Sequence, residues 1–270
     1  MPQQQHTTFL HIETTANHLR RRPWEIAMIQ RVTDGHAPPV DREILIQITG
    51  VDLTDADFAT LESNRFHKRH IEHRFDEDTA PAVWFPPAAP HPVMNLTHRD
   101  AMRRHAGALV DLVYQLTNTC EPGTVIAVPE SDAATIVAAW TGGTNVVGLD
   151  PEFDLLTLSL MLDRHGYRPQ PWNQHLTNIA TEAAGWLRAK VFYATGFIAA
   201  TAREFDVQTN AETMGGRLLG ELTQLPRHTG RLAELCDVAA ITDEETQTAL
   251  GGARWIRRWW DAITPQQVNR

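Results

Sequence analysis

Three short apolar segments follow one another within the first 50 residues of the chain. They span residues 8–12, 25–32 and 43–48, are rich in Ile, Leu and Val, and are separated by clusters of Arg, Pro, Gly and Asp. Segments of this length and composition are typical of β-strands, and the turn-forming residues between them favour pairing of consecutive strands. The sequence therefore predicts an antiparallel meander at the start of the fold.

After the meander, the pattern alternates between helices and strands. The predicted elements are a helix from Thr97, a strand at 124–128, a helix from Ser131 to about Trp140, a strand at 145–148, a helix from Pro151 and a helix at 241–263. Such an alternation predicts a parallel crossover attached to the meander. We expect an α/β fold, with a mixed sheet flanked by helices, formed as a single domain over residues 1–270. Five prolines predict a loop at 76–96, and a helical insertion is expected at 188–226.

The composition limits the classes of protein to which the chain can belong. No run approaches the roughly 20 apolar residues that a membrane span needs, and residues 1–6 have neither a basic nor an apolar signal region. We therefore expect a cytoplasmic protein without a membrane partner. The formal net charge of −9 argues against broad coating of nucleic acid, although a locally basic groove could still bind a single strand. Cys120 and Cys236 lack a ligand-like spacing, so neither a disulfide framework nor a zinc site follows from them.

Four separated motifs carry a resemblance to a known family. Residues 9–16 read Phe-Leu-His-Ile-Glu-Thr-Thr-Ala, residues 146–154 end in Phe-Asp, and residues 246–255 read Thr-Gln-Thr-Ala-Leu-Gly-Gly-Ala-Arg-Trp. In this order they resemble the motifs of the DEDDh (DnaQ-like) 3′-5′ exonucleases of the ribonuclease-H-like superfamily. The fourth motif, at 162–176, is similar to a segment of phage and actinobacterial members. The resemblance implies a ribonuclease-H-like sheet with metal ligands at Glu13 and Asp154.

The resemblance also implies that most of the catalytic set is missing. Glu13 and Asp154 stand at retained positions, whereas His11 and Gly252 replace metal-binding Asp residues and Gln247 replaces the general-base His. Hydrolysis needs two Mg²⁺ ions roughly 3.5–4 Å apart, and these hard cations need anionic oxygen ligands. Because three of the five catalytic positions are substituted, the sequence does not decide whether the chain is an enzyme. We predict a noncatalytic protein that binds a nucleic-acid end or a protein partner, with no tightly bound cofactor and only weak Mg²⁺ or Mn²⁺ binding, if any.

The sequence leaves two other functions open. In the first, the chain is an atypical active exonuclease. Either His11 binds a softer ion such as Mn²⁺ or Zn²⁺ together with Glu13 and Asp154, or an acid at 243–245 takes the place of a missing metal-binding acid. In the second, it is an interaction protein without affinity for nucleic acid. Without the resemblance, Glu13 and Asp154 are simply ordinary acids at a strand end and in the first turn of a helix.

Residues beside the motifs are candidates for binding a single strand, because aromatic rings next to guanidinium groups can stack bases and hold phosphates. The simpler interpretation of the C-terminal helix is core packing with surface arginines. Basic runs at 20–22 and 67–74 are most simply solvated surface, and a phosphate contact is the alternative at 20–22. The full candidate set for nucleic-acid binding is Thr14, Thr15, Phe153, Arg254, Trp255 and Arg258.

Overall fold

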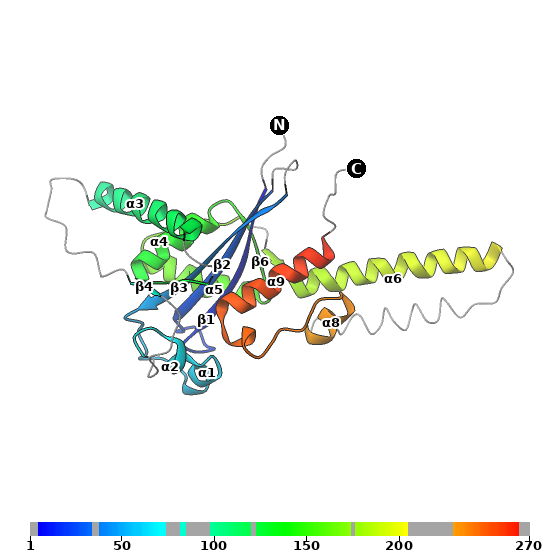
Figure 1. Cartoon of the computed structure of the whole chain (residues 1–270), viewed down its shortest axis with the longest axis horizontal. Helices are drawn as coiled ribbons and strands as arrows, with labels where there is room; N and C mark the ends of the chain where they lie inside the picture. Colours follow the sequence, from blue (N-terminus) through cyan, green and yellow to red (C-terminus); the bar gives the residue numbers. More distant parts are fainter. Residues whose placement is uncertain are drawn as a thin grey trace.

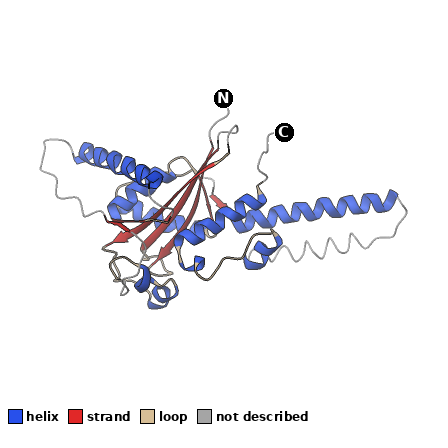
Figure 2. Cartoon of the chain, viewed as in Figure 1, coloured by secondary structure: helices blue, strands red, loops and turns tan. Residues whose placement is uncertain are grey.

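A computed structural model describes residues 5–33, 38–73, 82–84, 98–119, 123–173, 176–204 and 229–264. Within these residues, seven strands form one sheet in the order β4-β5-β3-β2-β1-β6-β7 (Figure 2). The centre of the sheet is an antiparallel meander of β1 (Gln5–Thr14), β2 (Pro23–Thr33) and β3 (Val40–Thr49). The predicted meander and the predicted α/β class are therefore confirmed.

The outer strands extend the meander on both sides. β5 (Val125–Pro129) pairs with β3, and β6 (Asn145–Gly148) pairs with β1, both in parallel. The two strands of the predicted crossover thus lie on opposite sides of the meander and are not neighbours. β4 (Ala82–Trp84) continues the sheet beside β5, and β7 (Leu176–Asn178) continues it beside β6. β4 lies inside the range predicted as a proline-rich loop, and the rest of 76–96 is outside the described residues.

One face of the sheet is covered by α3 (His98–Thr119), α4 (Glu130–Thr141) and α5 (Pro151–Arg164) (Figure 1). Side chains of a strand alternate between the two faces of a sheet. Leu10 and Ile12 of β1 therefore point to this side, where they pack with Met161 and Leu162 of α5 and with Trp140 of α4. This arrangement fixes the start of α5 beside the end of β1.

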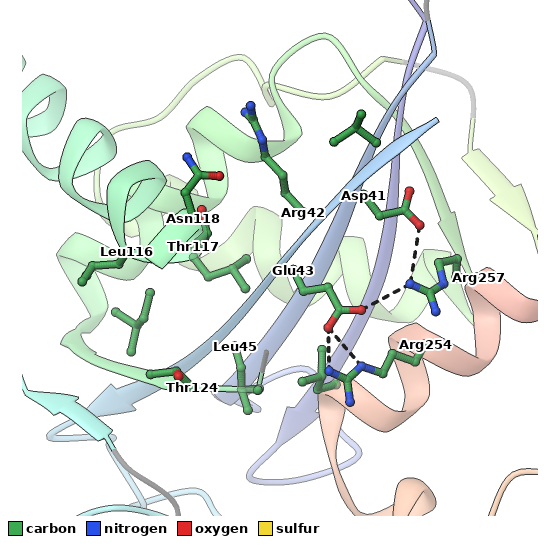
Figure 3. A pocket seen from close by; sticks show the side chains of 15 residues that line it. Asp41, Arg42, Glu43, Leu45, Leu116, Thr117, Asn118, Thr124, Arg254 and Arg257 are labelled. Atoms are coloured by element: carbon green, nitrogen blue, oxygen red, sulfur yellow. Dashed lines mark hydrogen bonds and ion pairs between the residues drawn. The ribbon is translucent and has the colours of Figure 1, made fainter. Parts of the chain in front are cut away.

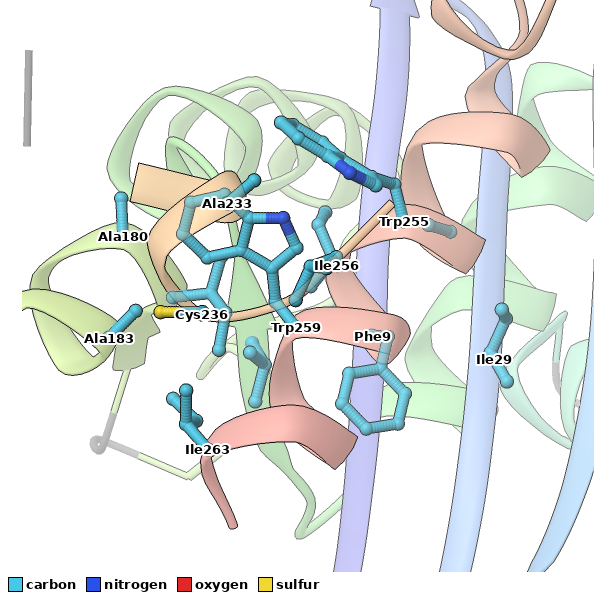
Figure 4. Close-up of a cluster of buried hydrophobic side chains, with 14 of the residues drawn as sticks. Phe9, Ile29, Ala180, Ala183, Ala233, Cys236, Trp255, Ile256, Trp259 and Ile263 are labelled. Carbon is cyan, nitrogen blue, oxygen red and sulfur yellow. The ribbon is translucent and has the colours of Figure 1, made fainter. Parts of the chain in front are cut away.

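The opposite face is covered by α9 (Ala249–Ile263), which in turn packs on α6 (Ile179–Glu204) and α8 (Thr229–Leu235). Trp255, Ile256, Trp259 and Ile263 of α9 belong to the same buried cluster as Phe9 of β1, and Figure 4 shows the Trp259 ring next to Ala233 and Cys236. These α9 residues have large apolar side chains, whose burial removes the most area from water. Core packing, the simpler interpretation of the C-terminal helix, is confirmed: Ala249, Ala253, Ile256 and Ile263 are buried, and Trp260 is partly buried.

The C-terminal helix begins later than the sequence predicted. The short helix η2 (Glu245–Gln247) precedes it, and the Thr248 side chain caps α9 by accepting a hydrogen bond of 2.9 Å from the Gly251 N–H. A threonine at this position satisfies a backbone donor that the first helical turn leaves free. Of the insertion predicted at 188–226, residues 188–204 belong to α6 and the rest lies outside the described residues.

Two short helices, α1 (Phe58–Ser63) and α2 (Phe66–Arg69), close one end of the meander. They form a small separate core in which Trp24 contacts Phe66 edge to face, with ring centroids 5.2 Å apart. α2 is thereby held beside the ends of β2 and β3. Among the helices described, none has the length and apolar character required to cross a membrane.

Candidate functional site

β1 and α5 bring three of the candidate residues together at one end of the sheet. His11 and Glu13 point from β1 to the α9 side, because they alternate with Leu10 and Ile12 on the other face. Asp154 comes from the first turn of α5. Nε2 of His11 lies 3.8 Å from Oε1 of Glu13, and its Nδ1 lies 4.0 Å from Oδ2 of Asp154. The imidazole therefore stands between the two retained acids.

Gly252 of α9 lies directly against the His11 ring. A Cβ built on Gly252 would lie 2.7 Å from Cγ of His11 and 2.9 Å from its Nε2, and closer still to Cδ2. Ordinary van der Waals contacts of a Cβ begin at 3.4 Å, so no side chain fits at position 252 while His11 keeps this place. The sequence analysis singled out His11 and Gly252 separately, and the structure shows that a side chain at 252 would need the space of the His11 ring.

Burial sets the protonation of this group. It lowers the pKa of His11 from 6.5 to about 4, with a further contribution from Arg69. It raises the pKa of Glu13 from 4.5 to about 8, and the neighbouring Glu25 adds to this rise. The pKa of Asp154 is raised well above its usual value by burial, then by Asp150 and Glu13. At neutral pH the imidazole is neutral and Glu13 is a neutral acid, so the site carries much less negative charge than two ionised carboxylates.

A buried carboxylate next to Glu13 was missed by the sequence analysis. Glu25 stands opposite Glu13 in the meander and is 1% exposed. It accepts hydrogen bonds from Nε2 of Gln47 at 3.0 Å and from the backbone N–H of Ala249, the first residue of α9, at 2.8 Å, and it forms an ion pair with Arg69. These contacts join the meander, α2 and α9. The signal that could have identified Glu25 is the pairing of the first two strands of the predicted meander, which places Glu25 opposite Glu13 on the same face of the sheet.

The basic turn at 20–22 is not simply solvated surface. Arg21 is 4% exposed. It donates hydrogen bonds to Oγ1 of Thr157 at 2.5 Å and to the backbone oxygen of Phe153 at 3.1 Å, and its guanidinium lies 3.6 Å from the centre of the Phe153 ring. The charge of Arg21 opposes the rise in the pKa of Asp154. Arg21 therefore holds the start of α5 against the meander, because a buried guanidinium needs several acceptors.

The second basic run, at 67–74, is also partly buried. His70 is fully buried, and Arg69 reaches inward to Glu25. The interpretation of this run as a solvated helix face is therefore wrong for these two residues. The reason is the small core around Trp24, over whose ring the Arg69 guanidinium lies at 5.1 Å.

A cavity of about 440 Å³ opens beside His11. His11 is 28% exposed at the side-chain level, so its ring forms part of the wall. Trp255 and Ile256 of α9 supply apolar surface, and Nε1 of Trp255 donates a hydrogen bond of 3.1 Å to the backbone oxygen of Ala239. Among the residues that the structure describes, the lining consists of His11, Leu149, Thr229, Gly230, Ala240, Ile241, Thr246, Gly252, Trp255 and Ile256.

The residues predicted to bind nucleic acid mostly have partners inside the protein. The Thr14 hydroxyl donates to the backbone oxygen of Ala16 at 2.9 Å, and the Thr15 hydroxyl accepts from the Arg22 N–H at 3.0 Å. Phe153 lies under Arg21. Within the candidate set, Trp255 is the residue that faces the cavity beside His11.

The two candidate arginines of α9 form ion pairs elsewhere. Arg258 binds both carboxylate oxygens of Glu245, at 2.7 and 3.1 Å. Arg254 donates to Oε2 of Glu43 at 3.0 and 2.6 Å and lines a different cavity, of about 570 Å³, between β3, the end of α3 and α9 (Figure 3). Arg257 bridges Glu43 and Asp41 in the same row. The pairs of Arg254 and Arg257 join α9 to β3, whereas the pair of Arg258 joins α9 to η2.

The residues that the sequence offered as replacement ligands do not fill the place of the missing acids. Glu245 is paired with Arg258, and hydrogen bonds from Arg258 and from Thr242 lower the pKa of Glu245 to about 2. Glu244 and Glu245 line a further cavity beside Lys68 and Arg69. Gln247 ends η2, and its neighbour Thr246, not Gln247 itself, lines the cavity beside His11.

The residues present do not fit a pair of Mg²⁺ ions. Such ions require several anionic oxygens, whereas the imidazole of His11 stands between Glu13 and Asp154 and Gly252 offers no ligand. A single ion held by His11, Glu13 and Asp154 is not favoured either, since in the described part of the chain their ligand atoms are not gathered within 4.8 Å of one another. Oδ2 of Asp154 is buried and has no hydrogen-bond partner among the described residues. A buried acid in that state is more stable when protonated.

In comparisons with known proteins, no protein-family model and no curated protein matches this chain.

Proposed function

We propose that the chain is a noncatalytic relative of the DEDDh exonucleases that binds the end of a single-stranded nucleic acid without cleaving it. The observation that carries this proposal is the place of His11, between Glu13 and Asp154 and against Gly252. An imidazole in that place puts a neutral group where hydrolysis needs anionic ligands for two cations. Without these cations, nothing in the described part of the chain keeps Glu13 and Asp154 ionised against the effect of burial.

The strand order supports a ribonuclease-H-like fold as part of the proposal. The meander carries the parallel strand β6 beside β1, and β7 follows on the same side. β1 is therefore central, and its carboxyl end meets the first turn of α5. Ligands in open α/β sheets commonly bind at the carboxyl ends of such strands.

The cavity supports a binding role. Its volume of about 440 Å³ is within the usual range for small-ligand sites, roughly 300–1,000 Å³. The lining combines Trp255, Ile256 and Leu149 with the neutral His11, so it suits a flat, weakly polar group such as a nucleobase. A site without ionised carboxylates also repels the phosphate backbone less than an empty metal site would.

Hydrolysis is tested with a 3′-labelled single strand and purified protein in Mg²⁺ or Mn²⁺. We expect the strand to stay intact. Sustained release of mononucleotides that disappears in Glu13→Ala rejects the noncatalytic proposal and favours the atypical exonuclease.

Binding is tested by fluorescence anisotropy with strands that have a free or a blocked 3′ end. We expect saturable binding that prefers the free end. Leu149→Trp should reduce binding by filling the cavity, whereas Leu156→Trp, at an exposed position of α5 outside the cavity lining, should not. Absence of binding at low salt refutes the nucleic-acid role, because phosphate contacts are strongest there, and leaves a protein partner as the remaining function.

A further inference from the structure

The turn that follows α2 gathers three potential metal ligands away from the site beside His11. Ligand atoms of His70, Glu72 and His73 all lie within 4.8 Å of one another, and this is the one group of three with that property among the residues that the structure describes. The chain makes a tight turn here, in which the His73 N–H donates to the backbone oxygen of His70 at 3.0 Å. The turn brings both imidazoles to the same side.

His70 is oriented as metal-binding histidines usually are. Its Nε2 lies 2.8 Å from the backbone oxygen of Ile48, and because a carbonyl oxygen only accepts, Nε2 carries the proton. Nδ1 then carries the lone pair, which accepts a long hydrogen bond of 3.3 Å from the Glu72 N–H. A metal ion bound to Nδ1 would replace this hydrogen bond. A hydrogen bond from the other ring nitrogen to a backbone carbonyl fixes the tautomer and the ring orientation of a ligating histidine.

The other two side chains are also restrained. Oε2 of Glu72 accepts a hydrogen bond of 2.6 Å from the Gly50 N–H, which leaves Oε1 free of that contact. The ring centroid of His73 lies 5.1 Å from that of His70 and 5.2 Å from that of Phe66. Phe66 also stacks on His70 at 4.7 Å. Packing on one phenyl ring reduces the entropy that the two imidazoles would lose on binding a metal.

We propose that His70, Glu72 and His73 form a binding site for one Zn²⁺ ion. Two imidazole nitrogens and one carboxylate oxygen are typical zinc ligands, whereas Mg²⁺ and Ca²⁺ prefer sites made of oxygens. In a tetrahedral site the ligand atoms are roughly 3.3 Å apart, so Glu72 and His73 close in on the fixed Nδ1 of His70. Water takes the fourth position.

The bound ion would connect the turn after α2 to the end of β3. Glu72 already contacts Gly50 and His70 contacts Ile48. The residue before His70 is Arg69, which pairs with Glu25 beside Glu13. The zinc site would thus stabilise the segment that holds Arg69 in place, and it is independent of whether the cleft beside His11 binds nucleic acid.

The experiment is a titration of the metal-free full chain with Zn²⁺, in competition with a coloured chelator. We expect one zinc per chain, and a weakening in Glu72→Gln and in His73→Ala that exceeds the roughly 10- to 100-fold loss caused by removing an outer-shell partner. His67→Ala is the matched control, because His67 also packs on Phe66, with centroids 5.2 Å apart, but is outside the ligand set. Its affinity for zinc should not change.

Circular dichroism of each variant shows whether it is folded, and Co²⁺ substitution adds a readout of geometry through the intense visible absorption of tetrahedral sites. The proposal is overturned if the wild-type chain binds no zinc. It is equally overturned if folded Glu72→Gln and His73→Ala retain wild-type affinity, or if His11→Ala removes the zinc while His73→Ala does not.

Discussion

The contact between His11 and Gly252 predicts a strong and testable coupling between these positions. In an unhindered helix, replacing Gly by Ala stabilises the protein by roughly 0.5–1 kcal/mol, because glycine loses more backbone entropy on folding. At position 252 the new Cβ would be 2.7 Å from Cγ of His11, well inside the 3.4 Å at which ordinary contacts begin. The ring lies 3.8 Å from a Glu13 oxygen and 4.0 Å from an Asp154 oxygen, so moving it away from the new Cβ would change its contacts with both acids.

The expected magnitude follows from these two opposing effects. Overpacking a closely packed site typically costs about 1–3 kcal/mol. After subtraction of the gain in helix propensity, Gly252→Ala should destabilise the protein by about 1–2 kcal/mol. Gly185→Ala is the matched control, because Gly185 is an exposed glycine of α6 with nothing within 4 Å of a built Cβ. That variant should gain about 0.5–1 kcal/mol.

Removal of His11 should reverse the sign. In a His11→Ala background the added Cβ at position 252 meets no ring, so Gly252→Ala should become neutral or stabilising. A double-mutant cycle should therefore show a coupling energy of about 1–3 kcal/mol, which is in the range found for residues in contact. Urea unfolding monitored by circular dichroism measures all four variants, with linear extrapolation to water. An equal cost of Gly252→Ala in both backgrounds would refute the steric explanation.

Three further predictions follow from the site. Glu13 has a pKa of about 8 in the folded protein against an ordinary 4.5, so the unfolded chain loses this proton at lower pH and the stability of the wild type falls between these two values. In urea unfolding, Glu13→Gln should therefore become more stable relative to the wild type from about pH 5 to pH 8. A difference in stability that does not change with pH would show that Glu13 is ionised in the native state. Arg69→Met should cost about 3 kcal/mol in the same measurement, because it removes the ion-pair partner of the buried Glu25 carboxylate. Lys68→Met, at the exposed position before it, is the control, and an equal loss of stability in both variants would contradict the buried pair. His11→Asp, Gln247→His and Gly252→Asp together should recover a Mg²⁺-dependent rise in melting temperature and some 3′-5′ cleavage, while single reversions should recover neither; a folded triple variant that does not bind Mg²⁺ would show that the cleft itself has changed.

Local patterns were sufficient to predict much of the fold. The meander, β6 and the helix after Pro151 were predicted because each is a short apolar or periodic segment bounded by turn residues. The positions of β5 and β6 on opposite sides of the meander were not predictable, since strand order depends on packing between distant segments. The short strands β4 and β7 have only three residues each, too few to show a period.

The same division applies to the candidate site. The resemblance to the DEDDh exonuclease motifs singled out His11, Glu13 and Asp154, which the structure brings together. The buried pair of Glu25 and Arg69 was not identified, because the two residues are 44 positions apart and a charged residue in a sequence is normally solvated. Only the folded structure, in which α2 lies beside β2, shows that Glu25 and Arg69 form a pair.

Under the proposed function, the steric relation between His11 and Gly252 also bears on how hydrolysis could be restored. An aspartate at position 252 would have to place its Cβ inside the space now held by the His11 ring. An aspartate at position 11 alone would add a carboxyl group to a buried site where burial already raises the pKa values of Glu13 and Asp154, and like charges there cannot all ionise without a cation. Each of these single substitutions therefore destabilises the fold without completing the set of metal ligands. If this reasoning is correct, the substitutions at 11 and 252 depend on each other, and the order of reversion matters: His11→Asp first should cost less stability than Gly252→Asp first.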